Sequence, residues 1–251
     1  MPSVLITGAS SGIGLELARI FARNGYSLVL VARSGARLEE LAAELKPAQV
    51  QVIALDLTLP EASEQVFHLA PHVDVLVNNA GYSVFGKFAD LPLADHLNIM
   101  QLNMAALVAL CHLYLPGMLA ARNGRIMNVA STAAFQPGPL MAIYYATKAF
   151  VLSFSEAIAN ELEGTGVTVT ALCPGPTETG FQARAKMENS GLVKGRKIMD
   201  ARTVAEAGYR ALMAGKTVEI PGLANKLLAQ SVRVGPRKMV VKLVRALQEE
   251  K

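Results

Sequence analysis

The 251-residue chain is long enough for one α/β domain with a well-buried core. Its hydrophobic content of 52% is high, but no uninterrupted apolar run approaches the roughly 18 residues of a membrane-spanning helix. The net charge is +4, and the two cysteines, Cys111 and Cys173, lie in apolar sequence, which indicates core thiols rather than a disulfide or a metal site. With no signal segment at the start, we expect a cytoplasmic protein.

Strand-like and helix-like segments alternate along the chain. Short apolar runs predict buried strands over residues 4–7, 27–32, 51–55, 73–78, 124–130 and 167–173, with a last strand over 218–220. Helices are predicted over 13–24, closed by Gly25, over 37–45, and between the later strands. Strands that are apolar on both faces are typical of parallel sheets covered by helices on both sides. We therefore predict an α/β fold with a single domain over residues 1–222 and an extension over 223–251.

The first strand runs into a glycine-rich loop with the spacing G-x-x-x-G-x-G. Glycine lets the chain turn sharply and lets the backbone approach a pyrophosphate, while the start of the following helix offers unpaired N–H groups to phosphates. An ordinary strand–turn–helix corner is the alternative interpretation, because this is not the commoner G-x-G-x-x-G pattern. The candidate cofactor contacts in this loop are Gly8, Ser10, Ser11, Gly12, Ile13 and Gly14.

The end of the second strand indicates which dinucleotide is preferred. An acidic side chain there would bind the adenine ribose hydroxyls and repel a 2′-phosphate. The sequence instead has Ala32 followed by Arg33, whose guanidinium matches phosphate geometry. We predict NADP(H) rather than NAD(H), with Arg37 able to share the role. A solvated surface charge is the alternative for either arginine.

Three side chains suggest a proton donor for carbonyl reduction. Tyr144 and Lys148 are four residues apart and share one face of a helix, and Ser131 follows the strand over 124–130. A phenol has a pKa of about 10, which a nearby fixed cation can lower by roughly 1–3 units. Tyr145 also lies near that helix face, and its spacing to the lysine alone does not exclude it as the acid.

These motifs together resemble the short-chain dehydrogenase/reductase family over about the first 220 residues. The resemblance rests on the glycine loop, on 78–81 (Asn-Asn-Ala-Gly) after a strand, on Asn103, on Tyr-x-x-x-Lys with Ser131 thirteen residues upstream, and on Pro174-Gly175 followed by Thr177 and Thr179. It implies a Rossmann-like, doubly wound parallel sheet. It also implies a reaction in which a ketone, aldehyde or 3-oxoacyl carbonyl is reduced to an alcohol, or the reverse.

The resemblance also assigns roles to individual residues. Tyr144 would protonate the carbonyl oxygen, Lys148 would hold the nicotinamide ribose and lower the tyrosine pKa, and Ser131 would bind the substrate oxygen. Asn103 would anchor a water beside Lys148, unless it is only a helix-interior or capping amide. Tyr145 would then be a packing residue.

Further cofactor contacts are carried over in the same way. Asp56 would lie near the adenine amino group with Leu57 beside the ring. Thr177 stands where the family often has valine, so we expect its backbone to retain the contact with the carboxamide. The remaining implied contacts are Asn79, Ala80, Gly81, Pro174, Gly175 and Thr179. An Asn-rich turn is the alternative for residues 78–81.

The substrate is predicted only as a small apolar carbonyl compound or alcohol. The family places a mobile lid at residues 180–200, where apolar side chains mix with Lys and Arg that either bind an anionic handle or are simply solvated. Leu140, Met141 and residues 82–88 would add apolar walls.

The extension over 223–251 carries the basic character of the chain, with seven Lys or Arg against two Glu. Its segments 226–234 and 238–247 look amphipathic. Packing on the domain or on a second subunit is one interpretation, and weak peripheral contact with an anionic membrane is the other. Nucleic-acid binding is not indicated, because the stretch lacks interleaved aromatic residues.

Two other function classes stay open. A non-catalytic NADP(H)-sensing protein would share the nucleotide site, and a sugar-nucleotide epimerase or dehydratase can share the Tyr/Lys pair but is usually longer. Family members usually pair through the long helices expected over 98–119 and 144–162, which predicts a homodimer or homotetramer.

Overall fold

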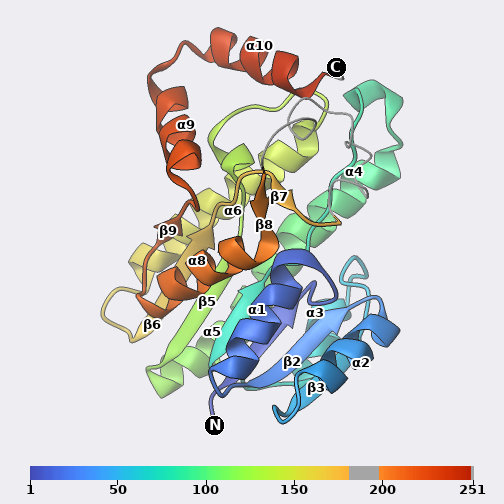
Figure 1. The fold of residues 1–251 in the computed structure, drawn as a ribbon, viewed down its shortest axis with the longest axis vertical. Coiled ribbons are helices and arrows are strands. Elements are labelled where there is room, and N and C mark those ends of the chain that lie inside the picture. The colour runs from blue at the N-terminus through green and yellow to red at the C-terminus, as the bar shows by residue number, and fades with distance from the viewer. Residues whose placement is uncertain (181–197, 250–251) are drawn as a thin grey trace.

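The computed structural model describes residues 1–180 and 198–249, and its centre is a parallel sheet of seven strands in the order β3-β2-β1-β4-β5-β6-β9 (Figure 1). The strands are β1 (Ser3–Thr7), β2 (Ser27–Ala32), β3 (Val50–Ala54), β4 (Val75–Asn78), β5 (Gly124–Val129), β6 (Val167–Leu172) and β9 (Val218–Glu219). All seven lie where the apolar runs predict them, with ends shifted by one or two residues.

The sheet is parallel because its central strands are buried on both faces. Val4, Leu5 and Ile6 of β1 are fully buried, and β1 pairs in parallel with β2 on one side and β4 on the other. Edge strand β3 differs, since Gln51 and Ala54 are exposed. The strand order reverses between β1 and β4, and such a point leaves a crevice at the carboxyl ends of the strands where ligands bind.

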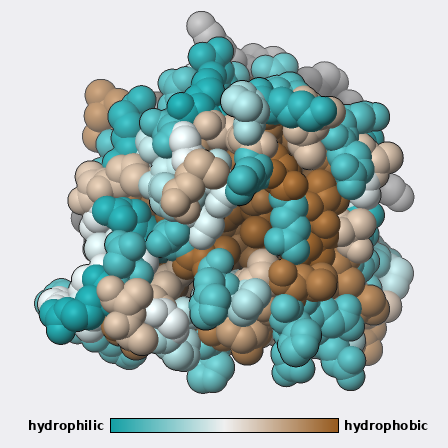
Figure 2. Space-filling view, turned by 90° about the horizontal axis from the view of Figure 1, so that it is seen from below, coloured by the Kyte–Doolittle hydropathy of each residue, from teal (hydrophilic) through white to brown (hydrophobic). Residues whose placement is uncertain are grey.

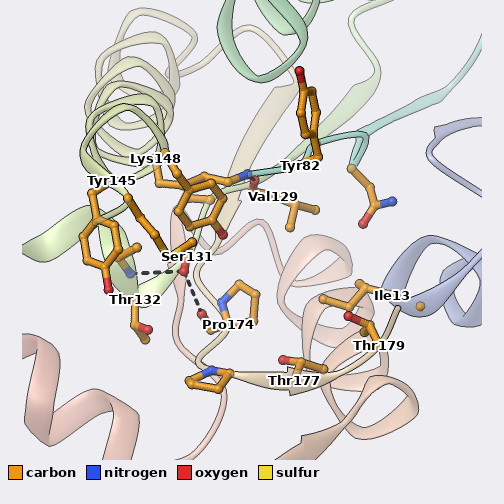
Figure 3. Close-up of a pocket in the computed structure, with 18 of the residues that line it drawn as sticks. Ile13, Tyr82, Val129, Ser131, Thr132, Tyr145, Lys148, Pro174, Thr177 and Thr179 are labelled. Carbon is orange, nitrogen blue, oxygen red and sulfur yellow. Dashed lines mark hydrogen bonds between the residues drawn. The ribbon is translucent and has the colours of Figure 1, made fainter. Parts of the chain in front are cut away.

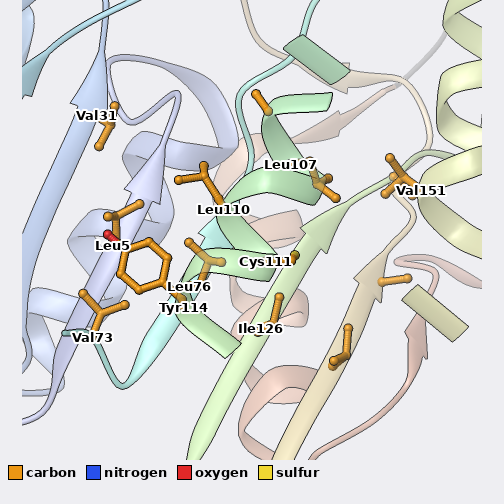
Figure 4. Packing of buried hydrophobic residues seen from close by; sticks show 14 of the residues in the cluster. Leu5, Val31, Val73, Leu76, Leu107, Leu110, Cys111, Tyr114, Ile126 and Val151 are labelled. Carbon is orange, nitrogen blue, oxygen red and sulfur yellow. The ribbon is translucent and has the colours of Figure 1, made fainter. Parts of the chain in front are cut away.

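Helices cover both faces of the sheet, which confirms the predicted Rossmann-like, single-domain α/β fold. One face carries α1 (Gly12–Arg23), α2 (Gly35–Glu44) and α8 (Ala201–Met213). The other carries α3 (Ala62–Leu69), α5 (Ala106–Ala121) and α6 (Ala142–Glu161). On this second face, Leu5 and Leu76 of the sheet pack with Leu110 and Tyr114 of α5 (Figure 4).

The helix before β5 is longer than predicted. It begins with α4 (Leu93–Met100), passes through a π-helical turn (Gln101–Ala105) and continues as α5. The stretch Leu93–Ala121 is long and apolar enough to cross a membrane by length and composition alone, and a third of its most apolar part is buried inside the molecule. Apolar side chains also gather on the face of the molecule shown in Figure 2.

Some elements were not predicted from the sequence. The two-residue strands β7 (Thr177–Glu178) and β8 (Met199–Asp200) pair in parallel beyond β6, and a 3-10 helix, η3 (Thr132–Phe135), follows Ser131. The C-terminal extension forms α9 (Leu223–Val234) and α10 (Arg237–Gln248), which Figure 1 shows arching over the end of the sheet.

Candidate active site

A cavity of about 1460 Å³ opens at the carboxyl ends of the strands. Its lining comes from the segments that follow β1, β2, β3, β4, β5 and β6, and from α6, α9 and α10. Figure 3 shows Ser131 and Lys148 on one side of this cavity and Ile13, Thr177 and Thr179 on another. The fold therefore brings the glycine loop and the Ser/Tyr/Lys residues to one space.

Ser131 is held rigidly where β5 ends and η3 begins. Its Oγ accepts a hydrogen bond of 3.1 Å from the N–H of Ala133 and donates one of 3.3 Å to the carbonyl of Pro174 (Figure 3). The first bond is an N-cap, which fixes the side-chain rotamer at the start of η3. The hydroxyl also shares a hydrogen bond with Tyr144, so the two candidate substrate-binding groups meet in the cavity.

Lys148 is buried beneath the cavity floor, one helical turn after Tyr144. Its Nζ donates a 2.7 Å hydrogen bond to the carbonyl oxygen of Val129 and lies 5.7 Å from the centre of the Tyr144 ring. Burial lowers the pKa of this ammonium to about 8, with the Cys173 thiol opposing the change. The lysine thus retains a positive charge at neutral pH in apolar surroundings, where its field is poorly screened.

The expected depression of the Tyr144 pKa is wrong for this structure. Burial raises the pKa of its phenol above the ordinary range, the hydrogen bond with Ser131 opposes the rise, and Tyr145 adds to it. Desolvation disfavours the phenolate more strongly than the neighbouring groups favour it. The phenol consequently keeps its proton at neutral pH, as an acid that donates to a carbonyl oxygen requires.

Tyr145 lines the cavity where it meets the C-terminal helices, and its hydroxyl is bonded to one of them. It is 6% exposed, and its hydroxyl accepts a 2.6 Å hydrogen bond from Nε2 of Gln248. Its ring packs with Ala133, Met141 and Val244. These contacts support the interpretation of Tyr145 as a packing residue.

Asn103 lies behind the cavity wall and ties the π-helical turn to its surroundings. Its Nδ2 donates to the carbonyl of Tyr82 at 3.1 Å and to Oγ1 of Thr147 at 3.2 Å, and its Oδ1 accepts from the N–H of Tyr82 at 3.2 Å. A Cβ at Gly81 would stand 3.1 Å from Asn103 Oδ1 and 3.6 Å from Lys148 Nζ. The amide is therefore close to the lysine, and its observed bonds position the loop after β4.

The glycine loop has the shape of a cradle for a dinucleotide. Gly8 (φ +66°) and Gly12 (φ +57°) occupy left-handed backbone conformations, and a Cβ at Gly12 would lie 2.9 Å from the Thr179 side chain. The Thr179 side chain thus lies against the loop, and its contact with the cofactor stays a prediction. Gly14 does not line the cavity, because a Cβ there would stand 2.4 Å from Asn79 Nδ2 and 2.5 Å from the Gly8 carbonyl oxygen.

The end of the cavity where we expect the adenosine of a dinucleotide is bordered by Arg33, Ser34, Arg37, Asp56 and Leu57. The guanidinium of Arg33 is largely exposed and lies 3.9 Å from Oδ2 of Asp56, while Oδ1 of that carboxylate accepts hydrogen bonds from Thr58. An ion pair this long between exposed groups is weak, which leaves the Arg33 guanidinium available to a phosphate. Among the described residues, this end of the cavity is bordered by two arginines, Arg33 and Arg37, and by one acidic residue, Asp56.

The sequence and the fold both match known proteins. A family model described as short chain dehydrogenase matches residues 2–190. The chain belongs to the short-chain dehydrogenase/reductase family. It is 33% identical over 225 residues to a ketoacyl reductase of a Nostoc species, covering 87% of this chain and 77% of the relative.

Two solved structures place this family member among enzymes of the same architecture. A short-chain dehydrogenase from Sphingobium yanoikuyae, in complex with NADPH, has a TM-score of 0.85 and 34% identity, with 100% of this chain and 99% of that one covered. The bulky-bulky ketone specific alcohol dehydrogenase from Comamonas testosteroni has a TM-score of 0.80 and 31% identity, covering 93% and 92%.

Most candidate residues of this short-chain dehydrogenase line the cavity. All the predicted catalytic and cofactor-contact residues do so except Gly14 and Asn103, which pack directly behind it. Of the predicted apolar walls, Tyr82, Val84 and Met141 line the cavity, whereas Leu140 and the rest of 82–88 are not among the lining residues. The lid predicted over residues 180–200 lies mostly outside the described residues. Sequence reasoning missed the apolar side chains of α9 and α10 that line the cavity, although the amphipathic pattern of residues 226–234 and 238–247 was the signal that these segments pack on something.

Proposed function

We propose that this protein is an NADP(H)-dependent reductase that converts an apolar carbonyl compound to an alcohol, with Tyr144 as the proton donor. The observation that carries the proposal is the meeting of Ser131, Tyr144 and Lys148 in one cavity with the glycine cradle. The nicotinamide, when bound, supplies or accepts the hydride.

The protein's own groups supply the remaining chemistry. Ser131 Oγ, fixed by the N–H of Ala133, orients the substrate oxygen next to the Tyr144 hydroxyl. The phenol transfers its proton to that oxygen as negative charge develops on it, and the buried ammonium of Lys148 stabilises the phenolate that remains. In the reverse direction the same tyrosine accepts the alcohol proton.

Preference for NADP(H) is supported by Arg33 and Arg37 at the adenosine end and by the NADPH bound to the Sphingobium structure. The substrate class is supported by the relatives, one a ketoacyl reductase and one specific for bulky ketones. The cavity's apolar lining from α9 and α10 agrees with both.

The first experiment is a titration with NADPH and NADH by nicotinamide fluorescence, followed by turnover with a panel of ketones and aldehydes. We expect NADPH to bind at least tenfold more tightly, a difference of about 1.4 kcal/mol. We also expect Tyr144→Phe to lose at least a hundredfold in kcat while NADPH affinity changes little. NADPH binding without turnover of any carbonyl compound would instead identify a sensor, and conversion of a nucleotide sugar would identify an epimerase or dehydratase.

We also propose that the protein forms a homodimer or homotetramer in the cytoplasm through the helices that include α5 and α6. Exposed apolar side chains on this part of the molecule include Leu97 on α4, Leu119 on α5 and Phe150 on α6. Such side chains gain from burial against a second copy.

A further inference from the structure

Helices α9 and α10 form one wall of the cavity. Figure 1 shows them at the end of the sheet where the cavity opens. The apolar side chains that they contribute are Leu228 and Val232 from α9 and Met239, Val240, Leu243 and Leu247 from α10. Met239 is 66% exposed and Leu243 is 58% exposed, and both line the cavity, so within the described part of the chain this wall presents uncovered apolar surface.

The C-terminal end of α10 is bonded to Tyr145, the neighbour in sequence of the candidate proton donor Tyr144. Gln248, which is fully buried, donates the 2.6 Å hydrogen bond from Nε2 to the hydroxyl of Tyr145, 103 positions earlier in the chain. One turn before Gln248, Val244 is buried against Ala133, Met141 and Tyr145. Ala133 follows Ser131 by two residues, so α10 packs on both segments that carry the reacting groups.

The attachment is a directed polar contact in an otherwise apolar junction. Oε1 of Gln248 has no hydrogen-bond partner in the part of the chain that the structure describes, so the amide is buried with only its donor side bonded to Tyr145. A single directed bond between two buried polar groups fixes the position of the end of α10 more narrowly than the surrounding apolar contacts do.

We infer that Gln248 and Tyr145 are positioning residues that hold α10 as the apolar wall of the substrate site, and that this wall selects a bulky apolar carbonyl compound over a small one. The inference rests on the proposed function and deepens it by naming the substrate class. Val240, Leu243 and Leu247 line the same cavity as Ser131 and Tyr144, so we expect a substrate with a long apolar arm to lie along this wall and a small ketone to make little contact with it. Selectivity between the two is thus the property that depends on the attachment.

The test compares valerophenone with 2-butanone as substrates of the full chain. For the wild-type protein we expect the lower KM with valerophenone. The readout is the kcat/KM for valerophenone divided by the kcat/KM for 2-butanone. In Gln248→Leu we expect this ratio to fall at least tenfold, because the KM for valerophenone rises. Glu249→Gln is the matched control, because Glu249 is the next residue but pairs with Arg245 at the surface, and its ratio should stay at the wild-type value.

A double-mutant cycle separates the attachment from general loosening of the tail. If the single hydrogen bond fixes the wall, Tyr145→Phe and Gln248→Leu should each lower the ratio, and the double variant should lower it no further than either alone. Thermal unfolding of each variant identifies loss of fold, and Tyr145→Phe, which retains the packed ring, keeps the test informative if Gln248→Leu does not fold. An unchanged ratio in the folded variants, or an equal loss with both ketones, would overturn the inference. Failure of the wild-type protein to reduce either ketone would overturn the proposed function instead.

Discussion

The ammonium of Lys148 donates a 2.7 Å hydrogen bond to the carbonyl oxygen of Val129, the last residue of β5. The strand end and helix α6 are thereby joined through a buried cation, two residues before Ser131. The bond holds Nζ beneath Tyr144, at 5.7 Å from the centre of its ring. Lys148 thus connects β5 to α6 through a hydrogen bond and also provides a positive charge at the site.

Because that cation is buried, Lys148 should make stability depend on pH. Folding lowers its pKa from 10.5 to about 8, so between these values the unfolded chain binds more protons and the contribution of this group to stability rises with pH. At pH 7 both states are protonated and the cost of burying the charge is complete. We expect Lys148→Met to be more stable than wild type at pH 7, and this advantage to shrink by about 2 kcal/mol by pH 9.5.

Urea unfolding of the two proteins at pH 7 and pH 9.5 measures this change. The buried thiol Cys111, whose pKa burial raises to about 12, is common to both proteins and cancels in the comparison. Cys173 interacts electrostatically with Lys148, so any change in its titration is counted together with the lysine. A difference between the two proteins that is the same at both pH values would contradict a depressed lysine pKa.

Arg33 should control the choice of cofactor. Its exposed guanidinium borders the end of the cavity proposed for the adenosine, and the ion pair it makes within the described residues is a 3.9 Å contact with Asp56. We expect Arg33→Ala to weaken NADPH binding by about tenfold, or 1.4 kcal/mol, and NADH binding by less than twofold. Arg23→Ala, an exposed arginine of α1 outside the cavity, is the control. Equal weakening of both cofactors by fluorescence titration would show that Arg33 acts on the common part of the dinucleotide or on the fold.

Much of the site is predictable because its determinants are local in sequence. Apolar runs predict the positions of the strands. Because the strands are parallel, their carboxyl ends lie at one edge of the sheet, and Ser131 follows one of those ends. The four-residue spacing of Tyr144 and Lys148 needs only a helix. Spacing and strand position therefore predict a serine, a tyrosine and Lys148 in one site, whereas the choice of Tyr144 over Tyr145 rests on the family resemblance.

The features that sequence reasoning missed depend on long-range packing. The direction of the Tyr144 pKa shift is set by burial, which comes from elements spread over the whole chain. The hydrogen bond between Tyr145 and Gln248 joins residues 103 positions apart. No local sequence pattern at either residue predicts that the two are partners. The same holds for Gly14, where the close neighbours are Gly8 and Asn79 from two different strand ends.

Phe150 should lie in the subunit interface if the proposed oligomer is correct. It is 38% exposed on α6, and its ring stacks on Phe154 with a centroid distance of 5.8 Å. We expect Phe150→Asp to shift the protein to a single-chain mass, or to weaken association at least tenfold, because a carboxylate would be buried at the interface. Sedimentation velocity measures the mass, with Leu59→Asp, another exposed apolar position, as the control. A monomeric wild-type protein would refute the interface.

Gly14 of α1 and Gly117 of α5 should respond to alanine with opposite signs. At Gly14 of α1 a Cβ would stand 2.4 Å from Asn79 Nδ2 and 2.5 Å from the backbone oxygen of Gly8, neither of which moves without disturbing the cradle. At Gly117 of α5 nothing lies within 4 Å of the added carbon. We expect Gly117→Ala to raise the free energy of unfolding by about 0.5–1 kcal/mol through helix propensity, and Gly14→Ala to lower it by about 1–3 kcal/mol through overpacking.

Thermal and urea unfolding measure both effects, and NADPH titration of Gly14→Ala should show weaker binding because Asn79 and Gly8 line the cavity. An alanine at position 14 that leaves both stability and NADPH affinity unchanged would mean that α1 can shift away from the strand ends without cost, contrary to the close packing seen there.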